Sequence, residues 1–413
     1  MPRAALVTAA LLAILSAAAF ADSRPAPRLH SAAKRVGHTF LISKSVTGGV
    51  PNGPSTRPVI SGDRRYVRVI AFQSEASDLV RGDTNQLQDV FAIKRGGTID
   101  NSGSKWKAGK TLLLSRGLNG QPANGPSFNV AVDGDFHDAP KCVVFLSAAS
   151  NLVKGDTNGV IDAFVSRGPG GAPQRVSLPG GKQATQDTTA VTVSGDCSRI
   201  AFVTGGRLYT RIGSKTHHVS TSGAAADPSF AAGASNDLVL GANGGVYLSP
   251  GGTGHPKLIA SGGRNPGYND LKRRVVAYEK RRGGHWQLVW RDLGKGEHVA
   301  SSFNGHLGNG DSSNPVVTNS GYYIGFDTRA SNLGTGPSLH QLDHNNHTDA
   351  YLRTDVRKIT IVESVEQDGH PLPGGGRHVS ISYYANYILF DSPAPLGAKN
   401  GPHQIFMRYL GGI

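Results

Sequence analysis

The chain is poor in cysteine and lacks the patterns that mark membrane spans, long helices and common catalytic sites. It has two cysteines in 413 residues and no Cys-x-x-Cys pair. No segment beyond the first 21 residues reaches the roughly 18 consecutive apolar residues of a membrane-spanning helix. Strong helical periodicity is absent there too. The Gly-x-Ser-x-Gly elbow, the His-Glu-x-x-His zinc motif and the P-loop are also missing, so no familiar motif identifies a reaction.

Glycine, by contrast, is abundant, at 55 residues. Short β-rich runs alternate with Gly, Pro, Asn and Asp, a pattern typical of an all-β chain with many turns. About 390 residues follow the N-terminal segment, which is enough for one large domain or two ordinary ones.

The N-terminus has the pattern of a secretory signal peptide. Arg3 precedes an uncharged apolar run over residues 4–20, and residues 19–21 fit the small-x-small cleavage rule. An uncleaved membrane anchor is the alternative, but the run is short for a span and Pro-rich polar sequence follows it. We expect a signal peptide over 1–21, a flexible leader over 22–37, and a protein that is secreted or resides in the periplasm or cell envelope.

Basic residues outnumber acidic ones. Lysine and arginine number 43 against 29 acids, for a formal net charge of +14. Such a balance would favour an anionic partner, such as a cell-wall polymer, lipid head groups or nucleic acid. The charges are scattered, however, with only small clusters such as 272–274 and 280–282, and a soluble basic surface is the simpler interpretation. No recognised nucleic-acid-binding module is visible, so no nucleic-acid partner is expected.

A seven-residue pattern, Asp-x-Asn-x-x-x-Asp, occurs three times, each time directly before a short apolar and aromatic run. A Ser-Asp-Leu or Ser-Asn-Leu triplet lies upstream of each copy. Internal repetition predicts a repeat architecture, which does not by itself name a reaction. The pattern residues are Asp83, Asn85 and Asp89, then Asp156, Asn158 and Asp162, and finally Asp343, Asn345 and Asp349.

From residue 38 onward the chain divides into seven repeats of four short strands. The second strand is the most apolar, the third contains an aromatic residue, and the fourth is a short Val/Leu/Ile run. The seventh repeat ends one strand short, and residues 39–43 resemble the missing strand. Such repeats arranged radially make a β-propeller, whose ring an N-terminal strand can close. We predict an all-β, seven-bladed propeller of antiparallel blades over 38–413; the weak fourth repeat leaves six or eight blades open.

The repeats resemble those of the TolB-like, or PD40, group of bacterial WD40-like propellers. The resemblance is carried by the blocks at 69–93 and 143–165, where the Ser-Asp/Asn-Leu triplet and a Gly-Asp-Thr-Asn run follow an apolar strand, and by a less regular copy at 323–352. It implies an envelope-associated interaction protein or the non-catalytic domain of a larger peptidase. Because the repeats run to the end of this sequence, we expect the former.

The Asp-x-Asn-x-x-x-Asp pattern is the best candidate for a metal site. Two carboxylates and an amide oxygen on a tight loop could supply hard oxygen ligands to calcium, although the glutamate at position twelve and the central glycine of an EF-hand are absent. His344 and His347 lie in the third copy and could modify it. A structural role is the alternative, because Asp and Asn side chains close turns on their own backbone. Calcium is the one cofactor that the sequence suggests.

The two cysteines, Cys142 and Cys197, stand at or just before equivalent strands of successive repeats. An even pair in an exported protein favours a disulfide, and neighbouring repeats could bring the two thiols within bonding distance. Two buried free thiols are the alternative. We predict the disulfide.

The leading functional hypothesis is an exported, monomeric, non-enzymatic propeller that binds a protein or an anionic envelope polymer through its top face or central funnel. The alternative is a propeller enzyme, a hydrolase or lyase acting on glycans, with acidic or histidine side chains converging on the channel. A third possibility is a scaffold that calcium stabilises through the repeated loops.

Overall fold

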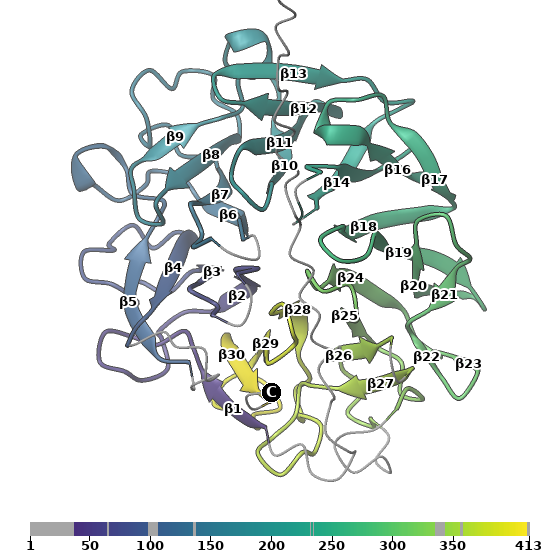
Figure 1. Ribbon diagram of the computed structural model, residues 1–413. Coiled ribbons are helices and arrows are strands. Elements are labelled where there is room, and N and C mark those ends of the chain that lie inside the picture. Colours follow the sequence, from purple (N-terminus) through teal and green to yellow (C-terminus); the bar gives the residue numbers. More distant parts are fainter. Residues whose placement is uncertain are drawn as a thin grey trace, which may run out of the picture.

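The structure is a computed structural model that describes residues 37–63, 66–97, 106–134, 138–231, 233, 235–334, 343–355 and 358–410. Its strands form seven four-stranded antiparallel sheets, which are arranged as blades around a central axis (Figure 1), and one small two-stranded sheet. Within a blade the strands pair in chain order, with the first strand nearest the axis and the fourth at the rim (Figure 1). The fold is therefore a seven-bladed β-propeller, as the repeats predict.

Blades 1 to 4 each take four consecutive strands of the chain. Their strands are β2 (Ser55–Ile60), β3 (Val69–Ser74), β4 (Asp89–Arg95) and β5 (Ala108–Leu113); β6 (Ser127–Val132), β7 (Cys142–Ser147), β8 (Asp162–Arg167) and β9 (Pro173–Arg175); β10 (Thr188–Val193), β11 (Arg199–Thr204), β12 (Arg207–Ile212) and β13 (Lys215–Val219); and β14 (Ala225–Phe230), β15 (Leu238–Ala242), β16 (Gly245–Ser249) and β17 (Lys257–Ser261).

Blades 5 and 6 follow the same plan, with a small hairpin of β22 and β23 between them, and blade 7 takes its fourth strand from the N-terminal end. The strands are β18 (Gly263–Asn269), β19 (Val275–Arg282), β20 (His285–Asp292) and β21 (His298–Val299); β22 (Ser302–Phe303) and β23 (His306–Leu307); β24 (Ser312–Val317), β25 (Tyr323–Thr328), β26 (Asp349–Thr354) and β27 (Ile359–Val362); and β28 (Arg377–Ile381), β29 (Tyr387–Pro393), β30 (His403–Tyr409) and β1 (His38–Leu41). Three short 3-10 turns are η1 (Leu118–Gly120), η2 (Pro179–Gly181) and η3 (Pro250–Gly252).

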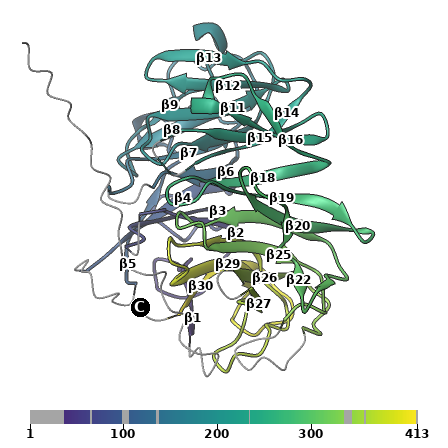
Figure 2. The same ribbon diagram turned by 45° about the vertical axis from the view of Figure 1, so that its right-hand side comes forward.

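The two ends of the described chain close the ring in blade 7. β1 pairs antiparallel with β30, from His38 opposite Tyr409 to Leu41 opposite Phe406. β1 lies beside β30 in both views (Figures 1 and 2). The predicted closure by an N-terminal strand is therefore confirmed, and it pairs the edge of β30 that would otherwise stay open.

Neighbouring blades are held together by apolar packing. Every residue of the second strands β3, β7, β25 and β29 is buried, as expected for the most apolar run of each repeat. Buried apolar side chains of the described residues form seven clusters, and each cluster spans two adjacent blades. The cluster between blades 7 and 1 contains Leu389 and Met407 together with Phe72 and Phe91. Apolar burial, the main force in folding, thus continues through the point of closure.

The weak fourth repeat is a complete blade, so the count of seven is confirmed. The predicted signal peptide and the leader up to residue 36 lie outside the described residues, and both stay predictions. Within the described ranges, no helix is long and apolar enough to cross a bilayer.

Candidate functional site

The innermost strands of all seven blades share a bulge. In each of them the register against the second strand shifts by one residue. In six blades one bulge residue has a left-handed backbone, with φ between 47° and 55°, which is uncommon outside glycine and is adopted most readily by Asn and Asp. The six residues are Arg57, Asn129, Asp227, Asn265, Asn314 and His378, and Thr189 stands at the bulge of blade 3.

Proline explains why several of these strands bulge. The left-handed residue is followed by proline in blades 1, 4, 5 and 6. Proline has no N–H to donate to a neighbouring strand, and within sheets it is confined to edges and bulges. The innermost strand is an edge of its blade, so proline is tolerated there.

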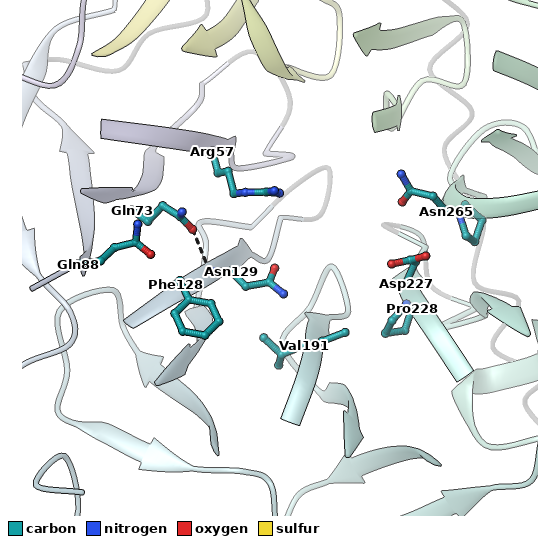
Figure 3. Close-up of a pocket in the computed structure, with 11 residues that line it drawn as sticks. Arg57, Gln73, Gln88, Phe128, Asn129, Val191, Asp227, Pro228 and Asn265 are labelled. Atoms are coloured by element: carbon teal, nitrogen blue, oxygen red, sulfur yellow. Dashed lines mark hydrogen bonds between the residues drawn. The ribbon is translucent and has the colours of Figure 1, made fainter. Parts of the chain in front are cut away.

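The bulges of blades 1 to 5 line a pocket of about 440 Å³ at the axis (Figure 3). Its walls include Arg57, Asn129, Asp227 and Asn265, each from a different blade, together with the amide side chain of Gln73. Figure 3 shows Arg57 and Asn129 across the pocket from Asp227. Its volume lies in the range of small-ligand sites, and its walls are mostly polar.

The opposite end of the axis is narrow. There the turns after the first strands meet across the axis: the side-chain amide of Asn319 in blade 6 donates to the carbonyls of Gly62, at 2.9 Å, and Gly134, at 3.3 Å. Gly134 also donates from its backbone to Gly195. A Cβ on Gly134 would lie 2.1 Å from the Gly62 nitrogen, so only glycine fits. Direct contacts thus join the turns of blades 1, 2, 3 and 6 at this end of the axis.

The pocket holds charges of both signs. Arg57 and Asp227 are both exposed, and neither forms an ion pair with another described residue. The surrounding protein raises the pKa of Asp227 by desolvation, and the nearby Glu279 carboxylate raises it further, while Arg264 opposes the rise. Arg57 and Asp227 are therefore available to a ligand that offers the opposite charge to each.

Buried polar side chains fix four of the bulges from the preceding blade. They occupy one position, directly after the buried Phe or Tyr of the second strand, in blades 5, 6, 7 and 1. Each accepts a hydrogen bond from the backbone N–H of the next blade's bulge residue. The pairs are Glu279 with Asn314 at 3.3 Å, Asp327 with His378 at 2.7 Å, Asp391 with Arg57 at 3.2 Å, and Gln73 with Asn129 at 3.1 Å.

Asp391 is the centre of a cluster of polar side chains in blade 7. It is fully buried and accepts from Arg377 Nε at 3.1 Å, while the Nδ1 atoms of His378 and His403 lie 2.5 and 2.7 Å from its oxygens. Burial alone would raise the pKa of Asp391, but the hydrogen bonds from the two histidines outweigh it and lower that pKa. Asp391 is therefore ionised, and it orients two imidazole rings.

The structure brings the asparagine and the final aspartate of each Asp-x-Asn-x-x-x-Asp copy together. The asparagine Nδ2 donates to the final aspartate Oδ2, and the same nitrogen donates to a carbonyl in the segment that leads into the next blade. The aspartate's other oxygen accepts from a serine that follows the fourth strand. The sets are Asn85, Asp89, Ala123 and Ser115; Asn158, Asp162, Ala184 and Ser177; and Asn345, Asp349, Leu372 and Ser364, at distances of 2.5 to 3.0 Å.

Two further blades make the same link with a single glutamine. Gln287 of blade 5 accepts from Ser301 and donates to the carbonyl of Gly308. Gln404 of blade 7 does likewise with Ser43 and Gly53. Five of the seven blades are therefore linked to the next blade in this way. This supports the structural interpretation of the Asp-x-Asn-x-x-x-Asp pattern.

The acidic pairs in these loops differ in whether a positively charged side chain lies beside them. In blade 2, Arg175 NH1 lies 3.1 Å from both Asp156 and Asp162. In blade 1, burial raises the pKa of Asp89 to about 6, and the Asp83 charge contributes to the rise. Calcium binding by the loops stays a prediction; it requires that a chelator lower the melting temperature.

The predicted disulfide is present. Cys142, in β7 of blade 2, is bonded to Cys197, in the turn between β10 and β11 of blade 3, with the two Cα atoms 6.1 Å apart. The carboxylate of Asp133 lies close to both sulfurs, but disulfide sulfurs are not thiolates and are poor metal ligands. The disulfide therefore joins blades 2 and 3.

The bulge residues and Asp391 were not identified as site residues from the sequence. The recurrence of a polar residue before proline in the strands themselves, as in Arg57-Pro58 and Asp227-Pro228, was the available signal. His217 and His218 lie exposed on the rim strand β13, and because neighbours on a strand face opposite ways, the two side chains do not point at one metal position.

Comparison with known proteins assigns no family. No family model matches the chain, and no curated protein matches its sequence. Solved structures that are similar in shape include the β-propeller domain of the Trilobed protease from Pyrococcus furiosus, with a TM-score of 0.49 and 7% identity over 86% of this chain and 95% of that one.

Two other similar structures belong to different kinds of protein. A putative TolB from Agrobacterium tumefaciens has a TM-score of 0.35 and 12% identity over 55% of this chain and 91% of that one. Virginiamycin B lyase from Staphylococcus aureus has a TM-score of 0.47 and 11% identity over 90% of this chain and 99% of that one. The likeness is that of distant propellers, so the resemblance to the TolB-like group holds only at the level of the fold, and function must be argued from this chain's own site.

Proposed function

We propose that this protein is an exported, non-enzymatic binding propeller whose central pocket holds a polar segment of a partner protein. The observation that carries the proposal is the pairing of Arg57 and Asp227 across one pocket, each without an ion-pair partner among the described residues. Amide side chains of Asn129, Asn265 and Gln73 complete the walls.

The mixture of charges favours a peptide over an anionic polymer. A polyanion would be attracted by Arg57 but would meet the Asp227 carboxylate on the opposite wall, which costs free energy. A peptide segment carries both signs of charge, and its backbone can pair with the asparagine and glutamine amides. Buried polar side chains hold the bulges of Arg57 and Asn129 in place. Two of the pocket groups are thus presented in fixed positions, which lowers the entropy cost of binding.

The experiment is capture of partners from an extract of the source cell envelope with the purified protein as bait. The variant R57N/D227N removes both charges yet keeps the net charge, and asparagine already occupies the equivalent left-handed position in three other blades. The control, R207N/D368N, removes one exposed residue of each sign elsewhere. We expect a peptide-bearing partner retained by the wild type and the control and lost with R57N/D227N. Equal retention by all three proteins would refute the proposal.

A second candidate function is catalysis at the same end of the channel. The favouring observation is the 2.5 Å contact of His378 Nδ1 with the buried Asp391, because a carboxylate that orients an imidazole is a common arrangement for a general base. Hydrolysis or lyase cleavage of a glycan library, abolished in His378→Asn, would support this candidate. Absence of turnover in the wild type would leave the binding function as the better account.

A further inference from the structure

A second, smaller cavity lies between blades 6 and 7, outside the residues that line the central pocket. Its volume is about 120 Å³, and its lining includes Arg329, His347 and Thr348 of blade 6 with Arg377 and His403 of blade 7. Two backbone glycines complete the described lining. Two guanidinium groups and two imidazoles thus border a space large enough for a group of only a few heavy atoms.

No acidic side chain is among the described lining residues of this cavity. The adjoining acid, Asp391, is buried behind Arg377 and His403 and engages one nitrogen of each, Arg377 Nε at 3.1 Å and His403 Nδ1 at 2.7 Å. Arg329 donates from Nε to the Thr348 hydroxyl at 3.4 Å. Within the described structure, the terminal nitrogens of both arginines make no other hydrogen bond, so they are available to an acceptor in the cavity.

The internal repeats show that the fold does not require these basic residues. Arg329 follows the second strand of blade 6, where blade 1 has Glu75 and blade 2 has Ala148. His347 stands two residues before the final aspartate of its loop, where blades 1 and 2 have Leu87 and Val160. A requirement of packing would have been met by the residues of the other blades, so Arg329 and His347 call for another explanation.

We infer that this cavity binds an oxyanion group, such as the phosphate, sulfate or carboxylate of a ligand. Arginine presents planar N–H donors that match two oxygens of such a group, and here two arginines approach from separate blades. The inference goes beyond the proposed function, because the cavity shares no lining residue with the central pocket.

The test is isothermal titration calorimetry, in which the purified protein is titrated with inorganic phosphate, sulfate or acetate at constant ionic strength. Arg329→Ala reproduces the residue of blade 2, and His347→Leu reproduces that of blade 1. Arg116→Ala is the control, since it removes one positive charge at a distant position where Arg116 bonds only the Gly120 carbonyl among the described residues. Melting temperatures of all four proteins show whether each variant is folded.

We expect one of the three anions to bind the wild type, and Arg329→Ala to weaken that binding about tenfold. His347→Leu should weaken it less, and Arg116→Ala should leave it within about twofold, since a distant surface charge is screened. Preference for phosphate or sulfate identifies a tetrahedral group, and preference for acetate a carboxylate; either supports the inference. No binding by any anion would overturn it, as would equal weakening by Arg329→Ala and Arg116→Ala, which would mark a response to net charge alone.

Discussion

The seven blades fall into two arcs that differ at one position of the second strand. In one arc the position after the core residue of the second strand is polar, and in the other it is not. The residues are Glu279, Asp327, Asp391 and Gln73 in blades 5, 6, 7 and 1, against Leu146, Val203 and Gly241 in blades 2, 3 and 4. The polar arc fixes the next blade's bulge by a buried hydrogen bond, whereas in the apolar arc a disulfide joins blades 2 and 3.

The comparison teaches that the polar position shapes the pocket more than it strengthens the packing. Leu146 and Val203 bury well in the same place, so an apolar residue serves the blade equally. A polar one adds an acceptor that orients Arg57, Asn129, Asn314 or His378 at the axis. Such buried networks cost desolvation and must be fully paired to be stable.

The largest expected effect is that of importing the residue of blade 2 into blade 7. Asp391→Leu should lower the free energy of unfolding by about 3–5 kcal/mol, because Arg377, His378 and His403 would lose their shared acceptor within a buried site. Denaturant unfolding monitored by fluorescence measures this change. A loss under about 1 kcal/mol would show that the polar arc is not held by this carboxylate.

The disulfide is the corresponding test of the apolar arc. Replacing both Cys142 and Cys197 by serine should lower the free energy of unfolding by about 2–4 kcal/mol, since the bond closes a long loop in the unfolded chain. The same denaturant experiment, with and without reductant, checks it. Reductant should destabilise the wild type and leave the serine variant unchanged; equal stability of the two proteins under oxidising conditions would contradict this role.

Two acids at equivalent positions of the polar arc have pKa values shifted in opposite directions. Asp391 has three basic side chains as partners, but Asp327 accepts only the backbone N–H groups of His378 and Val379 among the described residues. Burial therefore raises the pKa of Asp327 to about 6, against an ordinary 3.8. The folded protein holds this proton more tightly than the unfolded chain, so the stabilising contribution is complete below about pH 4 and is lost as pH rises to about 6.

The wild type should thus lose about 2 kcal/mol of stability from Asp327 across that window. In Asp327→Asn, which cannot ionise, this part of the slope should be absent when unfolding is measured from pH 4 to pH 7. Parallel pH profiles for the two proteins would rule out the raised pKa of Asp327. Other buried acids contribute equally to both profiles, so the difference between them isolates this residue.

The fold was largely predictable from the sequence, because it depends on local patterns that recur. Seven blades and their closure could be predicted from three features. These are the apolar second strands, the turn residues between short runs, and the additional N-terminal strand at 39–43. The disulfide also followed, since Cys142 and Cys197 occupy related places in adjacent repeats. These features require only periodicity and repeat alignment.

The candidate site was harder to predict, because it depends on backbone geometry and side-chain direction. A left-handed residue such as Arg57 cannot be assigned from residue type alone, and its exposure at the axis follows from the bulge. In the repeated loops, residue type alone does not indicate that Asn85 turns its amide nitrogen, rather than its oxygen, toward Asp89. The cluster at Asp391 required the register of β28, β29 and β30.

The most direct test of the account exchanges the two pocket charges across the arcs. In R57D/D227R the composition and net charge are unchanged, and each left-handed position receives a residue type that the fold already places in that conformation. The binding affinity of the captured partner segment should fall more than about tenfold, because each of its charges would face a like charge. An unchanged affinity, with an unchanged melting temperature, would contradict the assignment of this pocket as the binding site.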